Sequence, residues 1–217
     1  MSGSPVRSSL MTYLALALVA AGAGACGEGD ATASDQTERR EPFTVETLDQ
    51  FVLRPDEAPK GTEFVEGSSG PFTVEELWPS DCCLGLQLEF EELGFRSAYG
   101  SRFEKPGYSG DPLVTRPGME YVNSTAVLFS TEDGASEAVE SWYRYFRAPS
   151  LDAVSTEGLG DEAIGVMGAP EAPAETVVLY LWRIGRLVLA VRAGGGTGTI
   201  GVGNIRPLAD RMDERAT

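Results

Sequence analysis

TVVLYLWRIGRLVLAV, residues 176–191, carries the strongest β-strand signal in the chain. It contains two apolar runs rich in β-branched and aromatic residues, 176–182 and 187–191, joined by Arg183-Ile184-Gly185-Arg186. Such runs favour β-strands, and a short link that contains glycine is typical of a β-hairpin. Because nearly every position in both runs is apolar, we expect the hairpin to be covered on both faces. The stretch therefore predicts the central strands of an antiparallel sheet.

Two amphipathic helices are predicted before and after this hairpin, over residues 132–147 and 204–215. The first carries one apolar face with helical spacing, made of Ala135, Ala138, Val139, Trp142, Tyr143 and Phe146, and Ser130 or Thr131 is its candidate N-cap. The second carries Ile205, Leu208, Ala209 and Met212, with Asn204 as its candidate cap. The predicted fold class is therefore α+β, an antiparallel sheet of about four to six strands packed against two amphipathic helices.

The remaining segments carry weaker signals. PFTVE recurs at 42–46 and 71–75, and each copy is typical of the start of a short helix; Thr73 with Glu76 forms a capping-box pattern. A helix is predicted for 85–93, ending at Gly94, although the alternation of Leu86, Leu88 and Phe90 also fits a strand. Further strands are expected at 51–53, 95–103, 121–129 and 163–167, and loops at 104–118 and 193–203.

The N-terminus has the parts of a secretory signal. Arg7 is the only charged residue before position 28, an apolar run covers 10–19, and small residues fill 20–25. This order of basic, apolar and small residues is typical of a signal peptide. The apolar run is shorter than the roughly 20 residues that a membrane-spanning helix needs. Cleavage is therefore favoured over a permanent anchor.

The segment Ala23-Gly24-Ala25-Cys26 resembles the lipobox of bacterial lipoproteins. The resemblance implies that lipid is attached to the Cys26 thiol and that cleavage leaves Cys26 as the first residue. It divides the chain into a signal peptide (1–25), a lipidated cysteine with a hydrophilic tether (26–41) and a single α+β domain (42–217). It also implies a membrane partner, held through the lipid on Cys26, and a place on the extracytoplasmic face of the cell membrane. A plain secreted protein and an uncleaved anchor are the alternatives.

Cys82 and Cys83 are adjacent in the chain, and with Cys26 they are its three cysteines. An oxidising compartment favours a disulfide. Adjacent Cα atoms lie only about 3.8 Å apart, so a vicinal disulfide needs a tight local turn. Pro79 and Gly85 make a turn plausible here. A vicinal disulfide, free or intermolecularly paired thiols, and a soft-metal site all remain open.

Composition excludes several classes of function. The chain carries 33 acidic and 17 basic residues, a formal net charge of −16, so we expect no nucleic-acid partner. It has no histidine, which excludes Ser-His-Asp and Cys-His catalysis and histidine-ligated zinc or haem. The glycine run at 193–203 lacks the Gly-Lys-Ser/Thr of a phosphate-binding loop. We therefore predict no catalytic residue and no cofactor, and no metal site apart from the soft-metal alternative at Cys82 and Cys83.

Three short motifs resemble those of extracytoplasmic lipoproteins from high-GC bacteria: Gly160-Asp161-Glu162-Ala163, Trp182-Arg183-x-Gly185 and Leu208-Ala209-Asp210-Arg211. The likeness brings no activity with it. The leading hypothesis is a non-catalytic binding or sensory module of the cell envelope, tethered to the membrane, with an unidentified ligand or envelope partner. The alternatives are a carboxylate-based hydrolase acting on envelope glycans and a structural partner in an envelope assembly.

Overall fold

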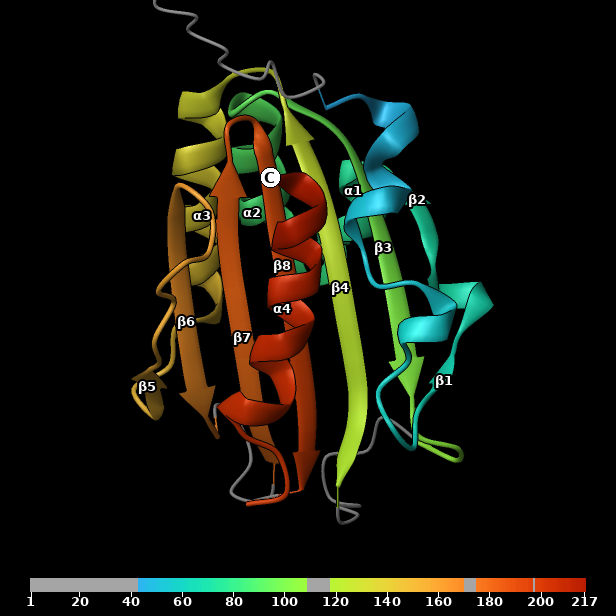
Figure 1. Ribbon diagram of the computed structural model, residues 1–217. Coiled ribbons are helices and arrows are strands. Elements are labelled where there is room, and N and C mark those ends of the chain that lie inside the picture. Colours follow the sequence, from blue (N-terminus) through green and yellow to red (C-terminus); the bar gives the residue numbers. More distant parts are fainter. Residues whose placement is uncertain (1–42, 109–117, 170–174, 197) are drawn as a thin grey trace, which may run out of the picture. The chain divides into compact units, whose positions relative to one another are not determined.

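The computed structural model of the protein describes residues 43–108, 118–169, 175–196 and 198–217 (Figure 1). The expected signal peptide (1–25), Cys26 and the tether (26–41) lie outside the described residues. The elements follow in this order: η1 (Val45–Phe51), η2 (Pro55–Glu57), β1 (Glu63–Phe64), η3 (Glu66–Ser68), β2 (Gly70–Phe72), α1 (Val74–Leu77), α2 (Ser80–Glu92), β3 (Phe95–Glu104), β4 (Met119–Phe129), α3 (Glu132–Phe146), β5 (Leu151–Ala153), β6 (Glu162–Gly168), β7 (Glu175–Ile184), β8 (Leu187–Gly196) and α4 (Val202–Ala216).

The predicted α+β class is confirmed, but the sheet has eight strands and is larger than expected. Its order is β1-β3-β4-β8-β7-β6-β5, and β2 also pairs with β3. All described pairings are antiparallel. Three of the strands, β1, β2 and β5, are only two or three residues long. Segments this short cannot display a period-two pattern, because such a pattern needs at least four residues to be recognised.

The hairpin of β7 and β8 lies at the centre of the sheet, as its composition predicts. Its turn consists of Gly185 and Arg186, since Ile184 already pairs with Leu187. Strand β8 continues to Gly196, so the expectation of a loop from 193 onward is wrong for residues 193–196. Glycine is required there because a side chain at Gly194 would collide with the Tyr121 ring.

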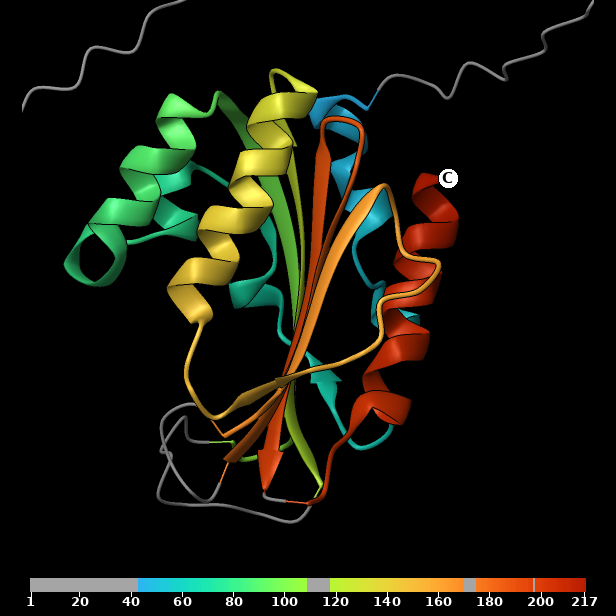
Figure 2. The same ribbon diagram turned by 90° about the vertical axis from the view of Figure 1, so that its left-hand side faces the viewer.

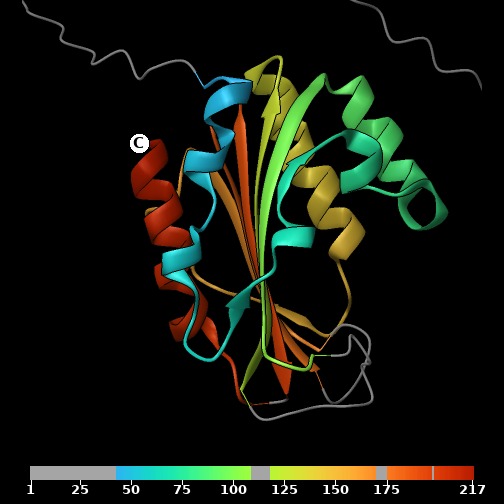
Figure 3. The same cartoon turned by 90° about the vertical axis from the view of Figure 1, so that its right-hand side faces the viewer.

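The two predicted amphipathic helices are confirmed as α3 and α4, and they cover opposite faces of the sheet (Figures 2 and 3). Helices α1, α2 and α3 pack on one face, and α4 and η1 pack on the other, so each face has its own hydrophobic core. Thr131 caps α3 by accepting a hydrogen bond from the Gly134 N–H. Asn204 lies inside α4 rather than before it, and its Oδ1 accepts from the Gly201 N–H.

The segments before β3 agree with the sequence in part. Helix α2 includes most of the predicted 85–93 segment, and Gly94 follows it with φ of 82°. The Thr73–Glu76 capping box is present at α1, with hydrogen bonds of 2.8 and 3.3 Å. The strand expected at 51–53 is wrong, because Phe51 ends η1 and Leu53 is bound by side chains of the sheet. Of the expected loop at 104–118, residues 109–117 lie outside the described part.

Two of the three short motifs contact each other at the end of the hairpin. The Asp161 carboxylate accepts a hydrogen bond from the Gly185 N–H at 2.7 Å, and Glu162 pairs with Arg183 at 2.9 Å. Gly160 has φ of 47°, and a side chain there would collide with the Arg183 carbonyl. These motif residues therefore fix the turn between β7 and β8, which is a structural role.

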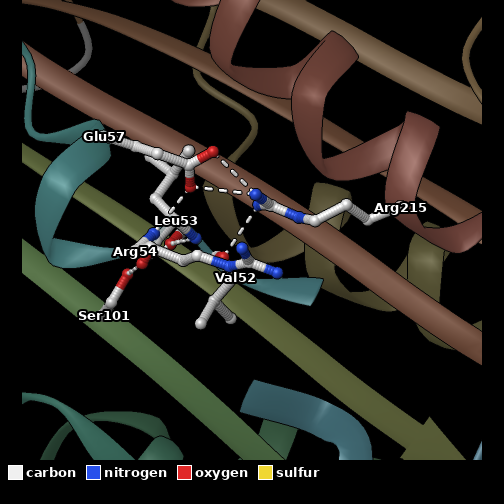
Figure 4. Close-up of polar contacts among 7 residues, drawn as sticks. Val52, Leu53, Arg54, Glu57, Ser101 and Arg215 are labelled. Carbon is white, nitrogen blue, oxygen red and sulfur yellow. Dashed lines mark hydrogen bonds and ion pairs between the residues drawn. The ribbon is translucent and has the colours of Figure 1, made fainter. Parts of the chain in front are cut away.

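Hydrogen bonds join the segment around Leu53 and Glu57 to both the sheet and α4 (Figure 4). The Leu53 N–H donates to the Ser124 hydroxyl at 3.0 Å, and the Ser101 hydroxyl donates to the Leu53 carbonyl at 2.7 Å. The two hydroxyl oxygens lie 2.7 Å apart, which closes a ring of hydrogen bonds around Leu53. Arg215 of α4 binds Glu57 in the same region.

Candidate functional site

The candidate site is a cleft on the sheet face that carries α1, α2 and α3. Two adjoining cavities, of about 420 and 760 Å³, lie between the sheet and these helices. They share five lining residues: Leu77, Trp78, Phe146, Leu179 and Arg192. Because the lining is shared, we treat the two cavities as one cleft. The volume of each cavity falls in the range of small-molecule sites, roughly 300–1,000 Å³.

The floor of the cleft is a single row of side chains that crosses five strands. In register, Arg102 pairs with Asn123, Asn123 with Arg192, and Arg192 with Leu179. Leu179 in turn pairs with Val166 of β6. Directly opposed residues of an antiparallel pair lie on the same face of the sheet with their side chains in contact. The row is therefore polar at its β3 end and apolar at its β6 end.

Arg192 lies where the two cavities meet. Its guanidinium carbon is 5.1 Å from the centre of the Phe146 ring and 5.7 Å from that of Tyr121, both within cation–π range. Within the described chain, no carboxylate lies within ion-pairing distance of Arg192. Arg192 is thus a half-buried cation held by aromatic rings rather than by a counter-charge.

Arg102, at the polar end of the row, is differently placed. It forms an ion pair of 2.5 Å with Glu104 and donates to Asn123 Oδ1 at 3.4 Å. Its guanidinium carbon lies 5.8 Å from the centre of the Tyr121 ring. The Glu104 carboxylate neutralises much of its charge, so Arg192 is the stronger source of positive potential in the cleft.

Tyr121 lies between the two arginines and is only 5% exposed. Burial raises the pKa of its phenol well above the ordinary value; Arg192 opposes this increase and Glu175 adds to it. The phenol is therefore neutral at physiological pH, and its ring offers a π-face to both guanidinium groups.

The wall of the cleft opposite the floor is aromatic. Trp78 and Trp142 meet edge to face, with ring centres 5.2 Å apart and an interplanar angle of 89°. Trp78 also contacts Phe146 at 6.2 Å and Phe90 at 5.7 Å. Trp78 and Trp142 are each at least nine-tenths buried, so this wall is fixed by packing before any ligand arrives.

The two cysteines predicted as a site lie at the edge of the same cleft, on the side of the larger cavity. The structure joins the Cys82 and Cys83 sulfur atoms by a disulfide bond in the first turn of α2. The tight backbone that adjacency demands appears at Cys83, whose φ of −137° and ψ of 25° depart from helical values. The Cys83 sulfur lies 2.9 Å from the Tyr145 hydroxyl. Cys26, the third predicted site residue, lies outside the described residues.

The cleft offers few groups for catalysis. Glu76 is the only carboxylate among its described lining residues, and it already accepts a hydrogen bond from the Thr73 N–H. No group of three Cys, Asp or Glu residues that could hold a metal ion occurs in the described part of the chain. The arrangement is suited to holding a molecule by apolar contact and a localised positive charge.

Sequence reasoning missed Arg102, Tyr121, Asn123 and Arg192. One signal for Arg192 was available, because it is the only charged residue in the apolar strand Leu187–Gly196. A charge in a central, fully covered strand is unusual and indicates either a partner or a site. Nothing local in the sequence indicates that Arg102 lies in the same row.

The comparisons with known proteins bear on the fold. No family model and no curated protein sequence matches the chain. Among solved structures, the extracellular domain of PknH from Mycobacterium tuberculosis is similar, with a TM-score of 0.50 and 15% sequence identity. The match covers 82% of this chain and 98% of that domain. At this identity the likeness establishes a shared fold alone.

Within the described residues, no helix combines the length and the apolar character needed to cross a bilayer.

Proposed function

We propose that this protein is an extracytoplasmic binding or sensory module, tethered to the membrane through lipid on Cys26, that holds a small molecule in the cleft. The cleft is the observation that carries the proposal. Two adjoining cavities of about 420 and 760 Å³ combine an apolar, aromatic wall with a few polar groups, which is the usual make-up of a ligand site.

The location rests on separate support. The Ala23-Gly24-Ala25-Cys26 segment resembles a lipobox, and the 26–41 segment has the composition of a hydrophilic tether. A similar fold serves as an extracellular domain in PknH. Both observations fit a module that works outside the cytoplasm.

The two alternative functions have less support. A carboxylate-based hydrolase needs a pair of acids across its substrate, and the described lining of the cleft offers Glu76 alone. An assembly partner needs a broad apolar patch on its surface. The large apolar side chains that are exposed in the described chain are Val45, Leu84, Leu88 and Tyr145, and of these only Leu84 and Leu88 are one helical turn apart.

Binding in the cleft can be tested with a neutral apolar fluorophore, N-phenyl-1-naphthylamine. Trp78 and Trp142 line the cleft, so a bound probe accepts energy from tryptophan excitation. We expect saturable binding to the chain from residue 26 onward with Cys26→Ser, which keeps every described residue. Asn123→Phe puts a ring into the floor and is expected to weaken binding about tenfold, which corresponds to ~1.4 kcal/mol.

The matched control is Arg96→Phe, which places the same ring at an exposed position outside the lining of the cleft. It should leave probe binding unchanged. Absence of saturable binding, or equal loss in the two variants, would contradict a ligand site in the cleft.

The tether can be tested separately by expressing the full chain with Cys26→Ala in a bacterial host and following its partitioning between membrane and soluble fractions. Lipid on the thiol requires the sulfur, so we expect the variant to leave the membrane fraction. Cys82→Ala serves as the control and should stay with the membrane. Unchanged partitioning of Cys26→Ala would overturn the lipid anchor.

A further inference from the structure

We propose that the ligand of the cleft is an amphiphile with one apolar chain and one carboxylate or phosphate headgroup, and that Arg192 binds the headgroup. This inference rests on the proposed binding function and names the chemical class of its ligand. It is carried by the position and surroundings of Arg192 in the cleft.

The charge of Arg192 favours an anionic ligand. Arg192 is half-buried at the junction of the two cavities, and among the described residues no carboxylate pairs with it. Taking a guanidinium partly out of water without a counter-ion costs free energy that an anionic ligand would recover. The lack of a counter-charge at Arg192 is unexpected in a chain that is rich in carboxylates and has a formal net charge of −16.

The Arg192 guanidinium is also held in place before any ligand binds. The Arg192 guanidinium packs against the rings of Phe146 and Tyr121, and its carbon lies 5.1 and 5.7 Å from their ring centres. The five N–H donors of a guanidinium lie in its plane, and within the described chain the Arg192 guanidinium contacts the two rings and donates no hydrogen bond. An edge with free, coplanar donors matches the two oxygens of a carboxylate or phosphate.

Asn123 supplies the neighbouring polar contact. It lies opposite Arg192 in the register of β4 and β8, and its Oδ1 already accepts a hydrogen bond from Arg102. Its Nδ2 group, a donor, therefore remains for a ligand. Donors from Asn123 and Arg192 together favour an anionic headgroup, and the charge of Arg192 repels a cationic one.

The apolar chain of the ligand has a defined direction. On the other side of Arg192 the row continues with Leu179 and then Val166. The larger cavity extends along these residues and is also lined by Val177, while Arg147, at the C-terminal end of α3, lines its helix side. An alkyl chain laid along this surface would remove apolar area from water, which favours binding. The headgroup at Arg192 and the chain over Leu179 thus fit one amphiphile.

The test is a competition against N-phenyl-1-naphthylamine with single-chain amphiphiles below their micellar concentrations. Dodecanoate and dodecyl phosphate are compared with neutral dodecanol and cationic dodecyltrimethylammonium. We expect the two anions to displace the probe at concentrations about tenfold lower than dodecanol, the scale of one charge-assisted hydrogen-bonded pair. The cation should compete least.

Arg192→Gln is expected to abolish the preference for the anions while retaining displacement by dodecanol. Arg211→Gln removes the same charge from an exposed position on α4, away from the lining of the cleft, and should keep the preference. Arg192→Lys restores the charge without the planar fork and should recover part of the preference, which guards against a folding defect in the glutamine variant.

The outcomes separate the two proposals. If the probe binds but dodecanol and dodecanoate compete equally, or if Arg192→Gln behaves like Arg211→Gln, the ligand class is wrong and the binding site stands. If the probe does not bind the unsubstituted protein, both the ligand class and the proposed binding function are overturned.

Discussion

Arg215 in the last turn of α4 donates to both carboxylate oxygens of Glu57, at 2.7 and 2.9 Å, across 158 positions of the chain (Figure 4). Arg215 also donates to the Val52 carbonyl at 2.8 Å. Both charged side chains are less than one-fifth exposed. This contact fixes the segment around η2 to the C-terminal helix, on the face opposite the cleft.

Removing one partner of this pair should destabilise the fold. Arg215→Gln leaves the Glu57 carboxylate without its cation in a largely buried setting, so we expect the free energy of unfolding to fall by about 2–4 kcal/mol in urea titrations. The control is Arg144→Gln, whose pair with Glu89 is 3.6 Å long and well exposed. Arg144→Gln should change the free energy of unfolding by no more than about 0.5 kcal/mol. Equal effects in the two variants would contradict a structural role for Arg215.

The hydrogen-bond ring around Leu53 gives a second prediction. Ser124→Ala removes the acceptor of the Leu53 N–H, which lies in the buried interior, and should cost about 1–3 kcal/mol of unfolding free energy. Ser155→Ala, at an exposed position, should leave the urea midpoint unchanged. A midpoint for Ser124→Ala that matches the control would show that the ring contributes nothing to stability.

Gly160 and Gly158 provide a matched pair for a third prediction. Both have positive φ, 47° and 83°, but a Cβ at Gly160 would collide with the Arg183 carbonyl, whereas at Gly158 it would meet only the end of the Arg206 side chain. Gly158→Ala should therefore cost only the conformational term of about 1–2 kcal/mol. Gly160→Ala should cost clearly more, measured by thermal and urea unfolding. The idea fails if the two alanine variants are equally stable.

Tyr121 predicts a dependence of stability on alkaline pH. Burial raises the pKa of its phenol in the folded state, so the unfolded chain loses this proton first as the pH rises above about 10. Fewer protons bound in the unfolded state mean that unfolding becomes easier with rising pH, by up to about 1.4 kcal/mol per pH unit from this group.

Tyr121→Phe should reduce that slope when unfolding free energies are compared between about pH 9 and pH 11. Some slope should remain, because burial also raises the pKa of Tyr108 and Tyr180. Tyr143→Phe is the control, since the Tyr143 ring lies on α3 and, within the described chain, makes no cation–π contact with Arg102 or Arg192. Identical slopes for the unsubstituted protein and Tyr121→Phe would contradict this role of burial.

The bond between Cys82 and Cys83 predicts a simple chemical result. The Cys26→Ser chain, treated with iodoacetamide under denaturing conditions, should gain no adduct before reduction and two after it, as measured by intact mass. Free thiols would react before reduction, and an intermolecular disulfide would give a dimer that reductant dissociates into monomers. Either result would contradict the vicinal disulfide.

The elements that the sequence predicted are those whose signal is local. The hairpin of β7 and β8 follows from two continuous apolar runs, and α3 and α4 follow from apolar residues that recur at helical spacing. Each pattern is contained in about 16 residues or fewer, so it needs no knowledge of distant contacts. The short edge strands β1, β2 and β5 have no such pattern and exist because a longer strand offers them hydrogen bonds.

Local patterns in the sequence were enough to predict the α+β class, the central hairpin, the two amphipathic helices and the adjacency of Cys82 and Cys83. Long-range contacts place α3 and α4 on opposite faces and bring Arg102, Asn123 and Arg192 into one row. The row depends on strand register. A shift of register by one residue turns every side chain of a strand to the other face of the sheet. Register is set by pairing between strands that lie far apart in the chain, so no local pattern reveals it.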